Sequence, residues 1–261
     1  MRLMTWNVNK FNGNRWSPKD HNWMDNQDIV RKENAKKIFE VIAQNIVADN
    51  DIAILQEFPY HEENWKREFE NQYKNHSIIS WYHEEQDKDY CVNTKYGVTV
   101  AVVKKNGNSK WHLHRLSNHS SNEKKTVDFS NRYIELFNDD IGINLMGVHP
   151  RDAEELEIWM KQKCKNNNIF HIIMGDFNAG NYVKEDCNEE FIDNRRKFID
   201  LSEGYIDVCN GMGTTNYNPP TQIDHILVQN SQKFWGRIKT RDVVYTKEYS
   251  DHFLLVTEIE I

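Results

Sequence analysis

The amino-acid sequence predicts an α/β protein in which helices flank β-sheets, folded as one domain over residues 1–261. Short runs with the period of strands alternate along the chain with longer runs that have the period of amphipathic helices. Aromatic residues make up 12% of the chain, including 8 Trp, which favours a core rich in β-sheet. No stretch resembles a linker, a repeat or a low-complexity segment, so we expect a single domain.

The first third of the chain predicts two helices among several strands. Ile38, Ile42 and Ile46 lie at positions i, i+4 and i+8, which indicates one apolar face of a helix over residues 29–48. Trp65 and Phe69 mark a second helix by the same spacing. Apolar runs predict strands at residues 3–8, 52–55, 77–82 and 97–103.

The remainder of the chain predicts more strands and two further helices. Helical spacing is found over residues 152–167 and 191–201. The expected strands span residues 112–116, 126–129, 133–137, 143–148, 169–174, 223–228, 235–244 and 253–259. Long polar stretches are expected to form surface loops, at residues 9–28, 83–95, 117–125, 179–190 and 210–221.

Composition places limits on location and partners. No apolar run approaches the roughly 18 residues that a membrane-spanning helix needs, and the N-terminus lacks the apolar stretch of a signal peptide, so we expect a cytoplasmic protein. Four scattered cysteines without a Cys-x-x-Cys pair argue against structural zinc and disulfides. The net charge of -7 provides no global attraction to nucleic acid, although a local basic groove with bound metal can still hold a phosphodiester.

Polar residues gather where the predicted strands end. A charged side chain at such a place is costly unless it is paired or bound to a metal. Hard divalent cations prefer carboxylate and amide oxygens, and phosphate-ester hydrolysis also needs a base and donors for the developing charge. Taken singly, each of these residues could be a helix cap, a turn former or a satisfied histidine. The residues concerned are Asn7, Glu57, His149, Asp176, Asn178, Asp224, Asp251 and His252.

In this order along the chain, these residues resemble the endonuclease/exonuclease/phosphatase superfamily. The most discriminating pair is Gly-Asp-Phe-Asn at residues 175–178, followed later by Ser-Asp-His at residues 250–252. The resemblance covers nearly the whole chain. It implies a four-layer α-β-β-α sandwich in which two mixed sheets pack face to face with helices outside.

The resemblance also implies a metal-dependent phosphoesterase. Glu57 would be the principal ligand of Mg²⁺, with Mn²⁺ as an alternative, and Asn7 and Asp251 would lie close to the ion.

The remaining residues would then carry the catalytic roles. Asp176 would orient or deprotonate the attacking water, which Asn178 would hold together with a phosphate oxygen. Asp224 would pair with His252 and keep it protonated towards the phosphate, and His149 would stabilise the transition state.

The substrate is left open by the motifs. Our leading hypothesis is a nuclease or phosphodiesterase acting on a nucleic acid or nucleotide, with Trp16, Arg151 and Asn216 as substrate-binding candidates. The alternative is a phosphatase or phosphodiesterase for a small phosphorylated compound or lipid headgroup. A catalytically silent binding module is a third hypothesis, which the complete set of expected residue types argues against. Pro59 departs from the pattern of abasic-site nucleases, and the Gln-Ile-Asp-His sequence at residues 222–225 departs from that of inositol 5-phosphatases.

Overall fold

Two β-sheets form the centre of the protein in its computed structural model. The structure describes residues 1–13, 27–60, 65–80, 97–105, 109–114, 132–164, 170–182, 189–210, 215–217, 220–244 and 249–261. Within these residues, one sheet has six strands and the other has seven. Each sheet contains both parallel and antiparallel neighbours, so both are mixed.

The first sheet is built around the N-terminal strand. β1 (Arg2–Asn7) lies between β13 (Leu254–Ile259), to which it is antiparallel, and β2 (Ile52–Phe58), to which it is parallel. The full order is β12-β13-β1-β2-β4-β3. The three further strands are β3 (His76–Ile79), β4 (Val98–Lys104) and β12 (Ile238–Val244).

The second sheet is built around the long strand β8 (Ile172–Tyr182). This strand is parallel to β7 (Ile143–Val148) and antiparallel to β11 (Pro220–Gln229). The order is β10-β11-β8-β7-β6-β5, with β9 pairing with β11 outside this path. The remaining strands are β5 (Trp111–Leu113), β6 (Tyr133–Asn138), β9 (Tyr205–Asp207) and β10 (Asn216–Tyr217).

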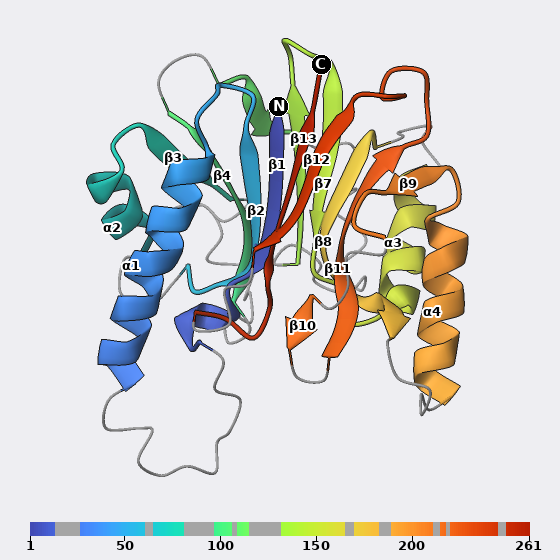
Figure 1. Cartoon of the computed structure of the whole chain (residues 1–261), viewed down its shortest axis with the longest axis horizontal. Coiled ribbons are helices and arrows are strands. Elements are labelled where there is room, and N and C mark those ends of the chain that lie inside the picture. Colours follow the sequence, from blue (N-terminus) through green and yellow to red (C-terminus); the bar gives the residue numbers. More distant parts are fainter. Residues whose placement is uncertain are drawn as a thin grey trace, which may run out of the picture.

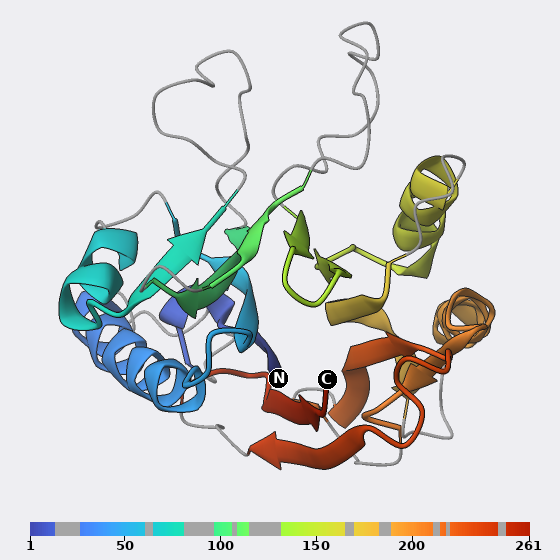
Figure 2. The same ribbon diagram turned by 90° about the horizontal axis from the view of Figure 1, so that it is seen from above.

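The two sheets pack face to face and carry helices on their outer faces (Figures 1 and 2). α1 (Gln27–Asn45) and α2 (Trp65–Gln72) cover the first sheet, and α3 (Ala153–Cys164) and α4 (Glu189–Leu201) cover the second. Alternate residues of each strand face opposite sides of its sheet. The four-layer α-β-β-α sandwich implied by the resemblance is therefore confirmed.

Three apolar cores correspond to the three interfaces between the four layers. Leu3 faces the second sheet in the central core, whereas its neighbour Met4 packs under α1 and α2. Met146 belongs to the third core, beneath α3 and α4. Burial of apolar area at roughly 25 cal/mol per Å² is the main force holding these layers together.

The structure corrects several predicted boundaries. Gly-Asp-Phe-Asn at residues 175–178 was expected just beyond a strand over residues 169–174, but it lies inside β8. The short strand β9 lies where no element was predicted, and β10 lies in a segment expected to be a loop. Two or three residues are too few to show a period. The strand expected at residues 126–129 lies outside the described residues.

The chain topology brings the end of β1 and the start of β13 to one end of the sandwich. In Figure 1 the two termini lie together at the top, β1 runs downward from there, and β13 runs back up. A short 3-10 turn, η1 (Asn9–Phe11), follows β1 at that lower end. Within the described part of the chain, no helix has the length and apolar character needed to span a membrane.

Candidate active site

The amide of Asn7 stands at the end of β1, where the two sheets face each other. Its Nδ2 donates to Asp176 Oδ2 at 3.0 Å and to Glu57 Oε1 at 3.4 Å. Its Oδ1 accepts the Asn9 backbone N–H at 3.0 Å, and its own carbonyl accepts the Ser250 hydroxyl at 2.6 Å. Asn7 therefore links both predicted carboxylates to the Ser250 segment. In this orientation it presents nitrogen to them, so ligation of a metal by Oδ1 would require the amide to turn over.

A β-bulge in β2 directs Glu57 towards this cluster. The pairing of β2 with β4 shifts register between Leu55 and Phe58, and Glu57 adopts a left-handed backbone with φ of 52°. A Cβ atom added to Gly97 would lie 2.6 Å from the Glu57 carbonyl carbon, so only glycine allows this close approach. Glu57 is thus a residue within a strand, placed by a strained bulge rather than by a strand end.

Asp176 lies at the centre of the cluster and is almost fully buried. Its Oδ2 is 3.7 Å from Nε2 of His149 and 3.7 Å from Nε2 of His252. His149 Nε2 is also 3.7 Å from Glu57 Oε1. One carboxylate oxygen of Asp176 is therefore shared among an amide and two imidazole groups.

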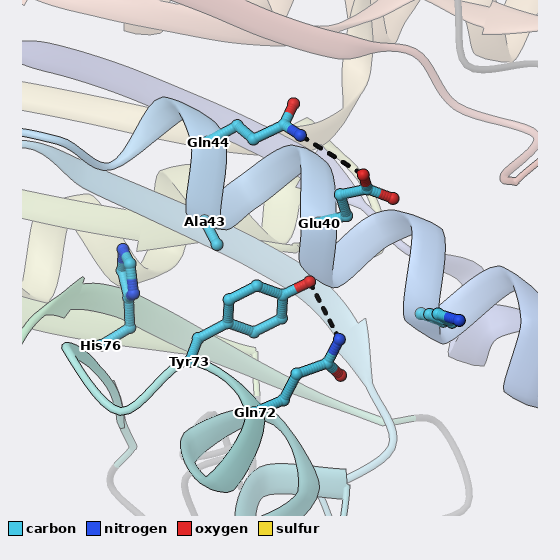
Figure 3. A pocket seen from close by; sticks show the side chains of 7 residues that line it. Glu40, Ala43, Gln44, Gln72, Tyr73 and His76 are labelled. Atoms are coloured by element: carbon cyan, nitrogen blue, oxygen red, sulfur yellow. Dashed lines mark hydrogen bonds between the residues drawn. The ribbon is translucent and has the colours of Figure 1, made fainter.

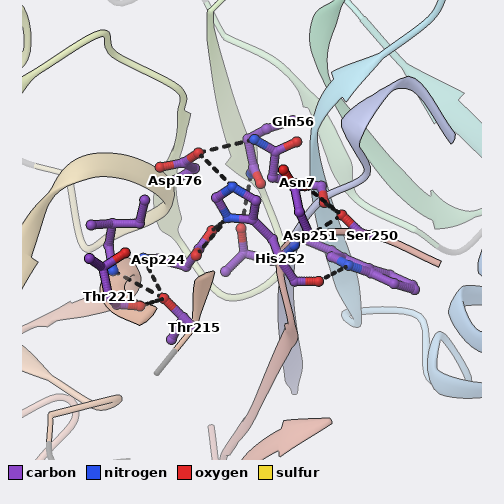
Figure 4. Close-up of polar contacts among 12 residues, drawn as sticks. Asn7, Gln56, Asp176, Thr215, Thr221, Asp224, Ser250, Asp251 and His252 are labelled. Carbon is purple, nitrogen blue, oxygen red and sulfur yellow. Dashed lines mark hydrogen bonds and ion pairs between the residues drawn. The ribbon is translucent and has the colours of Figure 1, made fainter. Parts of the chain in front are cut away.

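His252 lies between Asp176 and Asp224 (Figure 4). Its Nδ1 is 2.9 Å from Asp224 Oδ2, and its carbonyl accepts the Trp6 indole N–H at 3.1 Å. Since an ionised carboxylate only accepts hydrogen bonds, Nδ1 carries a proton and Nε2 faces Asp176. The structure therefore brings together the Asp224–His252 pair that the sequence predicts.

Thr215 is a residue of this site that the sequence analysis missed. It is fully buried, and its Oγ1 accepts the backbone N–H groups of Ile223 and Asp224, each at 3.0 Å. Its carbonyl accepts the Phe253 N–H at 2.8 Å, so one residue connects the segments that carry Asp224 and His252. A lone threonine in a polar stretch has no pattern from which this role could be read.

The two histidines of the cluster have opposite protonation tendencies. Burial is the largest influence on the pKa of His252 and would lower it, but the carboxylates of Asp224 and Asp176 outweigh burial and raise that pKa to about 10. Burial lowers the pKa of His149 to about 4, and Asp176 opposes this only in part. At neutral pH His252 is therefore an imidazolium and His149 a neutral imidazole.

The carboxyl groups carry more negative charge than the site neutralises. Burial raises the pKa of Asp176, against the opposing charge of His252, and Asp224 raises it further. Burial also raises the pKa of Asp251, and the carboxylates of Glu57 and Asp176 add to the increase. Removal of these protons would therefore be favoured by a bound cation.

The oxygen-rich donor set suits a hard divalent cation. Glu57 and Asp251 supply carboxylates beside Asp176, where excess negative charge accumulates, and carboxylate oxygens are the ligands that Mg²⁺ and Mn²⁺ prefer. Asp176, Asp224 and His252 also bring one donor atom each to within 4.8 Å of one another, a set that differs from the predicted ligands. Because Asp224 is already bonded to His252, we regard these two as a proton-holding pair.

The segment after His149 connects the cluster to α3. Asn178 has a left-handed backbone with φ of 47°, and its Nδ2 donates to the Pro150 carbonyl at 2.8 Å. The Asn178 N–H donates to Asp176 Oδ1 at 2.9 Å. Asn178 thus orients Asp176 directly, while contact of its side chain with water or phosphate stays a prediction.

The predicted substrate-binding residues have different surroundings. Arg151 is largely exposed, and its Nε lies 3.4 Å from Oε2 of the buried Glu155. Asn216 begins β10, where its backbone pairs with Thr221 beside the Thr215 contact. Trp16 lies outside the described residues.

A separate hollow of about 450 Å³ lies between α1 and the segment joining α2 to β3 (Figure 3). Its lining includes Glu40, Tyr73 and His76 and contains none of the predicted site residues. Burial and the nearby Glu40 carboxylate raise the pKa of Tyr73, so the phenol stays neutral there. This hollow is on the helix-covered side of the first sheet, away from the space between the sheets.

Comparison with known proteins agrees with the observed fold. Among solved structures, the chain resembles the 3′ phosphatase NExo from Neisseria bound to product DNA hairpin, with 16% identity, a TM-score of 0.59 and coverage of 100% of both chains. It resembles the AP endonuclease LMAP from Leishmania major with 12% identity and a TM-score of 0.62, covering 100% of this chain and 87% of that one. The human Nocturnin catalytic domain has 14% identity and a TM-score of 0.55, with coverage of 100% and 93%.

These identities are low, so the structural likeness supports the fold alone. No curated protein sequence matches the chain. A sequence profile of the Endonuclease/Exonuclease/phosphatase family matches residues 4–252, an interval that begins before Asn7 and ends on His252. The chain therefore belongs to the endonuclease/exonuclease/phosphatase family of hydrolases, which act on phosphoester bonds.

Proposed function

We propose that this protein is a Mg²⁺-dependent phosphodiesterase, active as a nuclease, whose single domain spans residues 1–261. The observation that carries the proposal is the convergence of Asp176 with an imidazolium, a neutral imidazole and an amide at one carboxylate oxygen. Such a group can accept a proton on one side while donors stabilise a phosphate on the other. Mn²⁺ is expected to replace Mg²⁺ because both prefer oxygen ligands.

Glu57 would hold the metal ion, with Asp251 and the Asn7 oxygen close to it. When bound, the ion would act as a Lewis acid and neutralise negative charge on the phosphate. The raised pKa of Asp251 supports its place in the metal site, because a cation would replace the proton that burial and Glu57 favour.

Asp176 would take the proton of the attacking water. Its pKa is raised by burial, which makes it a stronger base than an ordinary aspartate. The Asn7 amide and the Asn178 N–H each bond one of its oxygens, so the carboxylate is held in one orientation.

His252 would donate a hydrogen bond from Nε2 to a phosphate oxygen. Asp224 holds the opposite ring nitrogen, which maintains both the tautomer and the positive charge. His149, neutral and close to both Glu57 and Asp176, would donate to a second phosphate oxygen in the transition state.

The nucleic-acid substrate is supported by the surroundings of the site and by the likeness to known structures. Arg151 is exposed near His149 and can contact a phosphate away from the scissile bond. Two of the similar structures are described by name as a DNA-bound 3′ phosphatase and an AP endonuclease. We extend that substrate class to this chain, with Trp16 and Asn216 as further contacts, and propose a cytoplasmic location.

The test is hydrolysis of a substrate panel with and without Mg²⁺. The panel contains plasmid DNA, single-stranded DNA, RNA, cyclic dinucleotides, inositol phosphates and sphingomyelin. Metal-dependent cleavage of a nucleic acid is the expected result, and the Asp176→Asn variant should be inactive on the same substrate. Cleavage of inositol phosphates or sphingomyelin alone would replace the nuclease proposal with that of a phosphatase or phosphodiesterase for small substrates.

A further inference from the structure

A second buried Asp–His pair lies on the opposite face of β11 from Asp224. Because successive strand residues point to opposite faces, Asp224 faces His252 and its neighbour His225 faces α4. His225 has no exposed surface. Its Nδ1 is 3.0 Å from Asp207 Oδ2, and its Nε2 is 3.1 Å from the Ala179 carbonyl oxygen. Both ring nitrogens are therefore engaged.

The partners of His225 hold its ring at both nitrogens. A backbone carbonyl only accepts hydrogen bonds, so Nε2 must donate to Ala179. Nδ1 pairs with Oδ2 of Asp207, and the other oxygen of Asp207 accepts the Cys209 N–H at 3.0 Å, so the partner of the ring is itself held in place.

This ring contacts the residues on either side of Asn178. Phe177 packs edge-on against it, with ring centroids 5.4 Å apart, and Ala179 accepts its hydrogen bond. A Cβ atom at Gly180 would lie 2.3 Å from His225 Nε2, so the strand can approach the ring this closely only with glycine there. Phe198 of α4 stacks on the ring at 4.2 Å between centroids.

Asn178 needs such support because its backbone is strained. A left-handed backbone with φ of 47° costs free energy in a non-glycine residue, although asparagine tolerates it better than most, and contacts with neighbouring residues hold it in place. The same conformation lets the Asn178 N–H donate to Asp176 Oδ1. His225 thus contacts this part of β8 from the face of the sheet that is covered by α4. Asp176 is oriented on the opposite face, towards the cluster.

We propose that His225, paired with Asp207, is a positioning residue for Asp176 and Asn178. The inference rests on the proposed phosphodiesterase function, since the turn that it holds carries the proposed base. His225 itself does not touch the substrate, because it lies on the face of the sheet away from the cluster. Its loss is expected to affect turnover, not substrate binding.

The first experiment compares His225→Phe with Phe198→Leu, a control that alters packing on the same ring without removing a hydrogen bond. His225→Phe should lower kcat by at least about tenfold with KM changed by less than about threefold, whereas Phe198→Leu should keep kcat within about threefold. In an Asn178→Ala background, His225→Phe should lower kcat by less than about threefold, because both act through one turn. Full kcat in a folded His225→Phe variant, or independent losses in the double variant, would overturn the inference.

The second experiment needs no activity. Nitrogen-15 NMR of the intact chain should find a proton on Nε2 of His225, where the Ala179 carbonyl accepts it, and Asp207→Asn should change the Nδ1 signal of the same ring. This measurement also applies if His225→Phe does not fold, since Asn has nearly the same shape as Asp. An Nε2 without a proton in the unmodified protein would refute the contact by which His225 holds the turn. Failure of the unmodified protein to cleave any substrate of the panel would instead reject the proposed function, with the NMR result unaffected.

Discussion

Nδ1 of His252 lies 2.9 Å from Oδ2 of Asp224, and both side chains are buried. Asp224 thereby fixes the ring so that Nε2 points at Asp176, 3.7 Å away. Because the two residues act through one shared proton, replacing either of them is expected to remove the function of both.

Asp224→Asn and His252→Ala should each reduce kcat by roughly 100-fold or more, within the range of general acid–base contributions. The double variant should be little worse than either single variant, because removing one partner already removes the function of the other. Steady-state kinetics of the four proteins test this. Losses that multiply would show that the two residues act separately.

Replacing Glu57 should weaken metal binding without unfolding the protein. Mn²⁺ should raise the melting temperature of the unmodified chain but not that of Glu57→Gln, because a ligand stabilises a protein only to the extent that it binds. Thermal melts with EDTA and with Mn²⁺ measure this. Glu260→Gln, at an exposed ion pair with Lys239, is the control and should respond to Mn²⁺ normally. An unchanged Mn²⁺ response in Glu57→Gln would place the metal elsewhere.

Gly97→Ala should damage the site through the backbone of Glu57. Its Cβ would lie 2.6 Å from the Glu57 carbonyl carbon, so the bulge must shift. Gly204→Ala is a matched control, since Gly204 also has positive φ, at 82°, but has open space around its Cβ position. Both variants should lose about 1 kcal/mol of stability from backbone strain. Urea unfolding should show a larger loss of stability for Gly97→Ala than for Gly204→Ala, and only Gly97→Ala should bind Mn²⁺ more weakly. Equal effects of the two variants would contradict the role of the bulge.

The free energy of unfolding should decrease on acidification because His171 is harder to protonate in the folded state than in the unfolded state. Its Nδ1 accepts the Asn144 N–H at 3.0 Å, and burial together with Lys233 lowers its pKa. The folded pKa is thus below the value of about 6.5 in the unfolded chain. The unfolded state then binds more protons below about pH 6.5, and stability decreases as the pH falls from there through the folded pKa.

Urea unfolding at several pH values measures this contribution. His171→Asn keeps an acceptor near the Asn144 N–H but cannot be protonated, so its stability should depend less on pH over that interval. An identical pH dependence in both proteins would show that His171 is not responsible.

Arg151→Ala and Trp16→Ala should raise KM for a nucleic-acid substrate more than they lower kcat, because both contacts would form before the chemical step. Binding should also weaken steeply with salt, and less steeply once Arg151 is removed. Arg196→Ala, at an exposed pair with Asp193 on α4, is the charge-matched control. KM values that change equally in Arg151→Ala and Arg196→Ala would exclude a specific phosphate contact.

Local patterns in the sequence determined most of the elements and the identity of the cluster. The two-residue period of the strands and the helical spacing of Ile38, Ile42 and Ile46 are local, so they can be read without a structure. Residues such as Asp176 and Asp224 were identifiable because a carboxylate within or beside an apolar run needs a partner.

Contacts between distant segments decided the rest. Asn7 and Asp176 are separated by 169 positions, and the orientation of the Asn7 amide depends on Asn9, Glu57 and Asp176 together. The bulge at Glu57 depends on its pairing with β4 and on Gly97, and the second Asp–His pair forms only because β9 and β8 lie beside β11. Such features follow from strand pairing and burial, which are properties of the packed sheets and leave no periodic signal in the chain.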